Sequence, residues 1–397
     1  MPYMKLKIKQ VLKSKFTWIS LLAILLGCFY FWTKNYNSRY INPRITEARE
    51  NIAVEKKNIK YYQKQLKKSN LTKTNRHKIE LDLAENKSSI KEFQTLIKSI
   101  QTNKWQKAYQ IIIKQEKYNL ADAKRNNANK DDLLPLESNI KKLQYLARNN
   151  LPEENEHYSV KGGFFILEMM QEVLPPLAVL AVIFILIKLY SSGFYNRMRL
   201  ENLLPQGNHL LIEVGTGSLI GFGYFLSAFL LIFIIPSIFF STGNFKYPMM
   251  GVDAVAKQNI FIPMHQLFCP TLILELFSFM FIANVVLLFV QIFKNRLLAL
   301  FVSVFILIGG MVLPQYVVAA RNFAQFIPMS YFFSLQPVDG MFGISNAYVF
   351  ADETKLVTYP QVNFVNGILV LTVGIIILLL LNYLIAQKPR KGGKQND

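Results

Sequence analysis

The sequence predicts an all-α protein that crosses a membrane six times and carries a polar helical domain between its first two spans. Of the 397 residues, 52% are apolar and only 18% are charged, a balance that is unusual for a soluble protein. The apolar residues gather in six nearly charge-free blocks, each close to the roughly 20 residues that a helix needs to cross a bilayer. A stretch of about 130 mostly polar residues follows the first block.

The six blocks define the predicted spans, which are residues 16–33, 164–190, 212–240, 267–293, 297–319 and 364–386. The first block is expected to be an anchor rather than a cleaved signal sequence, because it is long and no small-residue cleavage site follows it. Cys28 and Cys269 both fall inside apolar blocks. We therefore interpret them as small apolar residues, and we expect neither a disulfide nor a zinc site.

Lysine and arginine predict the orientation, because short basic segments resist transfer out of the cytoplasm. The segments between the predicted spans, together with the two chain ends, alternate between the two sides of the membrane. Fourteen basic residues lie in or beside the segments on one side, and four lie in the two short segments on the other side. The basic side comprises segments 1–15, 191–211, 294–296 and 387–397, and the other side comprises 241–266 and 320–363. We expect a multi-pass protein of the bacterial plasma membrane with both termini in the cytoplasm. The net charge of +20 then needs no nucleic-acid partner.

The polar domain, residues 34–163, is expected outside the cell, since long domains are translocated largely regardless of charge. Apolar residues recur there every seven positions in two runs, which are Ile45, Ile52, Ile59 and Leu66, and then Leu83, Ile90 and Ile97. These runs predict a helical hairpin, and two shorter helices are predicted at 105–120 and 136–147. The heptads bury either a core of this domain or a coiled coil with a second chain. The 27 basic and 15 acidic residues either attract anionic lipid or cell-wall polymer or form a solvated surface.

The connection between the second and third spans predicts a short amphipathic helix. Its candidate residues are four apolar ones, three charged ones and a proline that ends the helix, namely Met198, Leu200, Leu203 and Leu204, then Arg197, Arg199 and Glu201, and Pro205. The apolar patch with its charged rim suits the groove of a partner protein. The alternative is a helix that lies on the inner leaflet.

This connection resembles the cytoplasmic loop of ABC-2 type permeases, in which Leu-Leu-x-x-Pro precedes the next span. Here Pro205 directly follows Leu204, and Gly207-Asn208-His209 replaces the arginine usual after the proline. Between the last two spans, Pro328-Met329-Ser330-Tyr331 and Val338-Asp339-Gly340 are similar to the Pro-x-x-Tyr and Val-x-Gly of that family. The resemblance covers six spans, both termini and these two loops. The large insertion after the first span occurs in only part of the family.

The resemblance implies the permease subunit of an ATP-driven ABC exporter, paired with a second permease copy and with a cytoplasmic ABC ATPase. The exported substrate is then expected to be a hydrophobic peptide, an antibiotic or a lipid-like molecule. One alternative is a mechanotransmitting ABC permease that acts on extracellular cargo or signals. The six predicted spans argue against it, because that family has four. The other alternative is a membrane-anchored scaffold or receptor.

No Gly-x-x-x-x-Gly-Lys-Ser/Thr motif occurs in the chain, so ATP and Mg²⁺ are expected only on the partner ATPase. The four histidines are scattered, and no serine stands in a nucleophile elbow. We therefore expect no cofactor, no metal site and no enzymatic activity of this chain by itself.

Three glutamates and two glycines inside or near the predicted spans are candidate functional residues. Glu275 lies well inside the fourth span, where a carboxyl must face protein, water or a cation, and it is either a pathway residue or a bundle-facing acid. Glu172, with Glu168, is expected near the outer mouth of the pathway, where a carboxyl is easier to hydrate than one deep in a span. Gly217 and Gly221 have small-xxx-small spacing, which predicts close helix packing within one chain or across a dimer.

Overall fold

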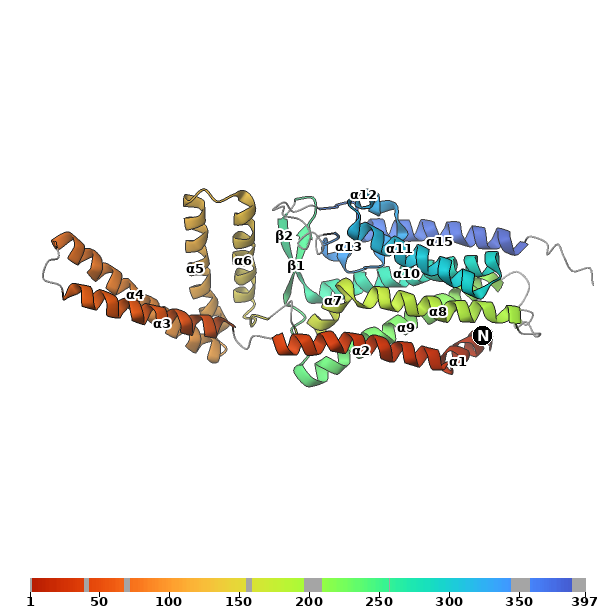
Figure 1. Cartoon of the computed structure of the whole chain (residues 1–397), viewed down its shortest axis with the longest axis horizontal. Helices are drawn as coiled ribbons and strands as arrows, with labels where there is room; N and C mark the ends of the chain where they lie inside the picture. The colour runs from red at the N-terminus through yellow and green to blue at the C-terminus, as the bar shows by residue number, and fades with distance from the viewer. Residues whose placement is uncertain are drawn as a thin grey trace, which may run out of the picture. The chain divides into compact units, whose positions relative to one another are not determined.

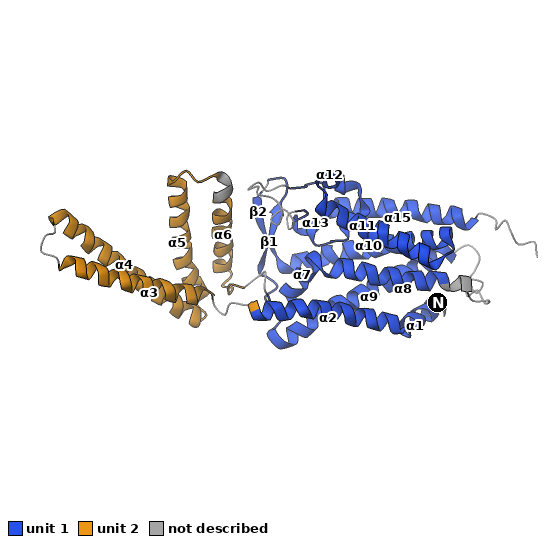
Figure 2. Ribbon diagram, viewed as in Figure 1, with its two compact units in different colours: residues 1–37, 156–397 blue, residues 38–155 orange. Residues whose placement is uncertain are grey.

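The computed structural model describes residues 2–38, 43–67, 72–154, 159–195, 209–256, 258–343 and 358–387 (Figure 1). The chain divides into two compact units, which Figure 2 distinguishes by colour. Unit 1 consists of Met1–Asn37 and Glu156–Asp397, and we call it the bundle; unit 2 consists of Ser38–Asn155, and we call it the polar unit. Nearly all of the described secondary structure is helical, which confirms the predicted fold class.

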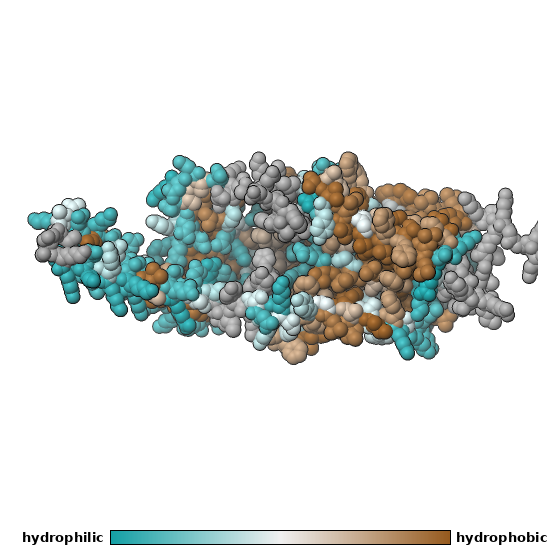
Figure 3. Space-filling view, in the orientation of Figure 1, coloured by the Kyte–Doolittle hydropathy of each residue, from teal (hydrophilic) through white to brown (hydrophobic). Residues whose placement is uncertain are grey.

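Six described helices are long and apolar enough to cross a membrane, as predicted. They are α2 (Lys15–Ser38), α8 (Leu174–Tyr195), α9 (His209–Phe240), α10 (Met264–Phe293), α11 (Arg296–Tyr316) and α15 (Phe364–Gln387). Helix α10 is central, since it packs against α8, α9, α11 and α15. Apolar side chains cover much of the visible bundle surface, brown in Figure 3. Phe301 and Phe305 of α11, for example, are 70% and 80% exposed, which suits contact with lipid tails.

The second span differs from the expectation of one continuous helix over 164–190. The structure divides this stretch into α7 (Gly162–Glu172) and α8, and only Leu174–Ser191 qualifies as a span. Proline has no N–H, so Pro175 cannot bond the carbonyl of Gln171 four residues earlier. The side-chain Nε2 of Gln336 donates to that carbonyl instead, at 3.0 Å. A residue far along the chain thus stabilises the break.

The connections at one end of the bundle contain short elements that the sequence pattern did not predict. Segment 241–266 forms an antiparallel hairpin of β1 (Pro248–Asp253) and β2 (Gln258–Pro263), in which Pro248 pairs with Pro263. The connection before α15 contains α12 (Val318–Arg321), η2 (Ala324–Phe326), η3 (Pro328–Tyr331) and α13 (Gln336–Asp339). Strand β1 and α13 are in contact. Gly340, which follows α13, has a φ of 75° and lies against the carbonyl of Val252.

The opposite end of the bundle begins with the short helix α1 (Pro2–Leu12), which lies in Figure 1 at the end away from the β-hairpin. Helix α1 packs against α8 and α9. The buried Nζ of Lys7 donates to the carbonyl of Leu189 at 3.2 Å, near the C-terminal end of α8. A buried ammonium group is costly unless it is hydrogen-bonded, so this bond stabilises the position of Lys7. One lysine of the basic N-terminal segment is therefore structural.

The polar unit consists of two helical hairpins. Helix α3 (Pro43–Leu66) packs against α4 (Lys73–Gln101), and α5 (Trp105–Arg125) packs against α6 (Lys130–Arg148). Helices α3 and α4 occur where the seven-residue repeats predicted a hairpin, and α5 and α6 occur where the two shorter helices were predicted. Helix α4 also contacts α5, and the unit has a small core of its own that includes the fully buried Tyr109 and Leu146.

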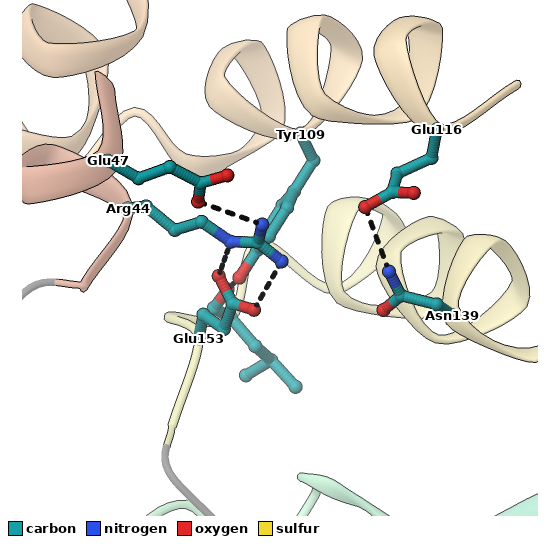
Figure 4. Close-up of polar contacts among 7 residues, drawn as sticks. Arg44, Glu47, Tyr109, Glu116, Asn139 and Glu153 are labelled. Carbon is teal, nitrogen blue, oxygen red and sulfur yellow. Dashed lines mark hydrogen bonds and ion pairs between the residues drawn. The ribbon is translucent and has the colours of Figure 1, made fainter. Parts of the chain in front are cut away.

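An ion pair joins the two chain ends of the polar unit (Figure 4). The Nε and Nη2 atoms of Arg44, at the start of α3, donate to both carboxyl oxygens of Glu153 at 3.0 and 3.1 Å. The Arg44 guanidinium also lies 3.5 Å from Glu47. Nearby, the hydroxyl of Tyr109 donates to the carbonyl of Leu151 at 2.9 Å. Adjacent chain ends are what the insertion of a domain between two spans requires.

Candidate functional site

A cavity of about 320 Å³ lies in the bundle where the chain leaves α2 and returns into α7. Six polar or charged residues line it: Lys34, Asn35, Glu168, Gln171, Glu172 and Asp339. Ten apolar residues complete the lining: Phe31, Phe164, Leu167, Met169, Val173, Met249, Met250, Leu267, Leu335 and Met341. The lining therefore comes from α2, α7, β1, the start of α10 and the region around α13. We call it the acidic cavity, after its three carboxyl groups.

Hydrogen bonds hold the end of α2 against the beginning of α7. The buried Asn35 donates from Nδ2 to Oε2 of Glu168 at 2.7 Å and to the carbonyl of Ser159 at 3.2 Å. One turn earlier in α2, the indole N–H of Trp32 donates to the carbonyl of Val160 at 3.1 Å. These bonds position Glu168 on one wall of the acidic cavity.

A second set of hydrogen bonds positions the opposite wall. Asp339 is 3% exposed, and its Oδ1 accepts from the backbone N–H of Met341 at 2.9 Å. Gln315 of α11 donates from Nε2 to Oε1 of Gln336 at 2.9 Å, and Gln336 in turn donates to the carbonyl of Gln171 in α7. Through this buried chain of amides, α11 and the α13 region are linked to the same helix that carries Glu168.

Burial changes the proton affinity of two carboxyls in the acidic cavity. It raises the pKa of Glu168 from 4.5 to about 7; the hydrogen bond from Asn35 opposes this rise, and the nearby Glu172 adds to it. Burial likewise raises the pKa of Asp339 from 3.8 to about 8, although the N–H of Met341 opposes it. Near neutral pH, both groups therefore exchange between protonated and ionised forms.

The size and the lining of the acidic cavity are typical of pockets that bind small molecules. Its volume is at the low end of ligand pockets, which span about 300–1,000 Å³. Most of its lining is apolar, with a few convergent polar groups, as ligand pockets commonly are. Within the described ranges, no cluster of histidine, cysteine, aspartate and glutamate is placed to hold a metal ion.

The two carboxyls predicted for a translocation pathway lie in different surroundings. Glu172 lines the acidic cavity and is exposed. Glu275 is 1% exposed, accepts a hydrogen bond from the hydroxyl of Ser334 at 2.9 Å and is outside the cavity lining. This geometry fits the alternative of a bundle-facing, hydrogen-bonded acid, and a pathway role for Glu275 stays a prediction. Glu168 lines the same cavity and is partly exposed, and its place near an outer mouth stays a prediction.

The two glycines with small-xxx-small spacing pack within the chain. A Cβ on Gly217 would lie 1.8 Å from the hydroxyl oxygen of Tyr190 in α8. A Cβ on Gly221 would lie 3.0 Å from Val182 of α8 and 3.2 Å from Phe279 of α10. Close packing of α9 on α8 and α10 therefore already uses this face.

All eight candidate residues for ATPase coupling, from Arg197 to Pro205, lie outside the described residues.

The sequence did not indicate that Lys34, Asn35 and Asp339 belong to one site. Asp339 stood within a quoted motif, Val338-Asp339-Gly340, but no pattern in the sequence connects it with α2 or α7. The pair Pro175-Pro176 was a usable signal, because it indicated a helix break directly after two glutamates.

Comparisons with known proteins give no family for this chain. No family model matches it, and neither the curated proteins nor the solved structures contain a significant match. The sequence patterns and the geometry of the site are therefore the grounds on which a function can be assigned.

Proposed function

We propose that this chain is the membrane-spanning subunit of an ATP-driven transporter, of the ABC-2 permease kind, in which a separate ATPase supplies hydrolysis. The observation that carries the proposal is a six-helix membrane bundle with a ligand-sized, partly acidic cavity at one end. A protein that only anchors another domain needs neither six spans nor such a cavity. The resemblance of the two loops to ABC-2 permeases supports the same assignment.

Polar groups buried among the spanning helices also support a transport role, because such groups are costly within a membrane and commonly mark pathways. Asn284 of α10 and Asn382 of α15 are fully buried, and Asn382 donates to the backbone carbonyl of Asn284 at 3.1 Å. The side-chain oxygens of both have no hydrogen-bond partner among the described residues. Two spans thus meet at groups that a rearrangement of the bundle can satisfy differently.

The orientation belongs to the proposal as well. The asymmetry of basic residues supports a cytoplasmic location for α1, the start of α9 and the turn between α10 and α11. The acidic cavity and the polar unit are then on the outer side of a bacterial plasma membrane. The resemblance to ABC-2 permeases implies that the substrate is exported, and the expected classes are hydrophobic peptides, antibiotics and lipid-like molecules.

A second copy of the chain is part of the proposal, since ABC-2 permeases work in pairs. Gly217 and Gly221 are engaged within the chain, so a dimer contact uses another face. The net basic polar unit is free in this arrangement to meet an anionic polymer or lipid outside the cell. No nucleic acid takes part.

Copurification tests the proposal. The tagged chain, expressed in its own host and extracted in mild detergent, should carry a polypeptide with a nucleotide-binding motif. Changing both Leu203→Asp and Leu204→Asp should lower the affinity for that ATPase at least a hundredfold, because it buries unpaired charge at the contact. The double variant Leu203→Ala with Leu204→Ala, which adds no charge, should lose less.

Two outcomes would redirect the assignment. An ATPase that copurifies equally with native chain and aspartate variant moves the coupling contact to another cytoplasmic segment, with the turn at Lys294 and Arg296 next. The absence of any copurified ATPase contradicts the transporter. It favours a membrane-anchored scaffold or receptor, for which the separately folded polar unit is the supporting observation.

A further inference from the structure

The described lining of the acidic cavity carries more acidic than basic groups. Three carboxyl groups and one exposed ammonium group, that of Lys34, line it. Among the described residues, no lysine or arginine forms an ion pair with Glu168 or Asp339. A buried carboxylate without a cation is unfavourable, so this wall of the cavity is incomplete by itself.

The remaining lining is apolar and adaptable. Four methionines, Met169, Met249, Met250 and Met341, contribute to it. Unbranched thioether side chains accommodate apolar groups of different shape. Phe31 and Phe164 add aromatic surface, which attracts cations as well as apolar groups. An occupant must therefore present a large apolar part and a smaller positive part.

We propose that the acidic cavity binds a small molecule that joins a protonated amine to an apolar body. The amine lies between Glu168 on α7 and Asp339 at the end of α13, and the apolar body lies against the methionines and phenylalanines. An anion would meet three carboxyl groups, and a neutral apolar molecule would supply no cation to Glu168 or to the buried Asp339. The claim that this molecule is the substrate of the transporter rests on the proposed function. The claim that the cavity binds it does not.

The source of the amine is either a free molecule or a lipid headgroup such as ethanolamine. Both present the same ammonium group to the carboxyls. A free amine enters from water, whereas a lipid amine arrives with an acyl chain. The two sources are distinguished by varying the membrane around the protein.

Binding should strengthen as the pH rises from 6 to 8.5. The pKa values of about 7 for Glu168 and about 8 for Asp339 mean that both ionise over this interval. A primary amine, with a pKa of about 10.4 as in lysine, stays protonated throughout. The other charged groups facing the site are Lys34 of α2 and Glu172 of α7, and both are exposed; β1 and the start of α10 contribute only apolar residues.

The experiment uses the purified full chain in nanodiscs of phosphatidylglycerol, with 4-phenylbutylamine as the probe and calorimetry as the readout. The native chain should bind the amine at least tenfold more tightly than the neutral 4-phenylbutanol. Glu168→Gln and Asp339→Asn should each weaken amine binding at least tenfold, and Asp339→Asn should also reduce the pH dependence. Lys34→Gln, an exposed change that does not threaten folding, should tighten binding, because it removes a competing cation.

Matched controls separate binding from folding and from lipid partitioning. Glu213→Gln makes the same charge change at the start of α9, at the other end of the bundle, and should leave the affinity within twofold. The helical spectrum and elution volume of each variant show whether it is folded. Replacing part of the lipid by phosphatidylethanolamine should weaken amine binding if the natural amine is a headgroup and leave it unchanged if it is free.

Equal binding of amine and alcohol would overturn the inference, as would an unchanged affinity in Glu168→Gln, Asp339→Asn and Lys34→Gln together. None of these measurements needs an ATPase. Amine binding without any copurified ATPase therefore refutes the transporter and keeps the site. ATPase copurification without amine binding refutes the amine site and supports the transporter.

Discussion

Gly340 is the residue at which the structure makes its sharpest prediction about stability. Its φ of 75° is in the left-handed region, and a Cβ built on it would lie 2.0 Å from the backbone oxygen of Val252. Val252 belongs to β1, where it pairs with Asn259 of β2. The obstructing atom is therefore part of a hydrogen-bonded hairpin rather than the end of a flexible side chain.

The cost of Gly340→Ala has two parts. Placing alanine in the left-handed region costs about 1–2 kcal/mol. Forcing extra atoms into packed structure typically costs about 1–3 kcal/mol, and the smaller freedom of the unfolded chain returns about 0.4–1 kcal/mol. At the middle of these ranges the net destabilisation is about 3 kcal/mol, which corresponds to a melting temperature lower by about 6–12 °C.

The assay is the fraction of chain that still elutes as a single species after heating in detergent. Gly309→Ala is the control, because no atom lies within 4 Å of the added Cβ and the residue is inside α11. Alanine is favoured over glycine in a helix by about 1 kcal/mol, so this variant should match or exceed the native chain. The expected shift is at least about 6 °C. A Gly340→Ala variant that melts within about 2 °C of the native protein would therefore refute the packing of the α13 turn on β1.

Two further predictions concern the orientation and the polar unit. In a chain with Cys28 and Cys269 replaced by alanine, single cysteines should react with an impermeant maleimide in intact cells at Ser88 and Val255 but not at Lys9 and Asn202; external reaction at Asn202 would reverse the topology. The polar unit, expressed as residues 38–155, should be strongly helical and should melt cooperatively. Arg44→Ala should lower its free energy of unfolding by about 1–2 kcal/mol, since a half-buried bidentate pair is lost, whereas Arg76→Ala, at an exposed pair, should cost under about 1 kcal/mol. A coil spectrum of the isolated unit would contradict the first of these expectations, and equal losses in the two variants would contradict the second.

Much of the fold could be predicted because its determinants are local in the sequence. An apolar block of about 20 residues in a membrane must satisfy its backbone hydrogen bonds internally, and a helix is the way to do so within one segment. The seven-residue repeats of α3 and α4 are equally local, since residues at that spacing share one face of a helix. The break between α7 and α8 was less predictable. Pro175 can kink a helix or end it, and the outcome depends here on Gln336, which supplies the missing donor.

The sequence by itself determined the six spans, the polar helical insertion and the side on which basic residues collect, because each depends on the composition of a continuous segment. The tertiary structure decided the rest. It brought Asn35, Glu168 and Asp339 to one cavity, although they are far apart in the chain. It also decided that Gly217 and Gly221 pack against α8 and α10 of the same chain. In both cases the physical reason is the same: burial and partnership are properties of what surrounds a residue, and the surroundings come from helices that only folding makes neighbours.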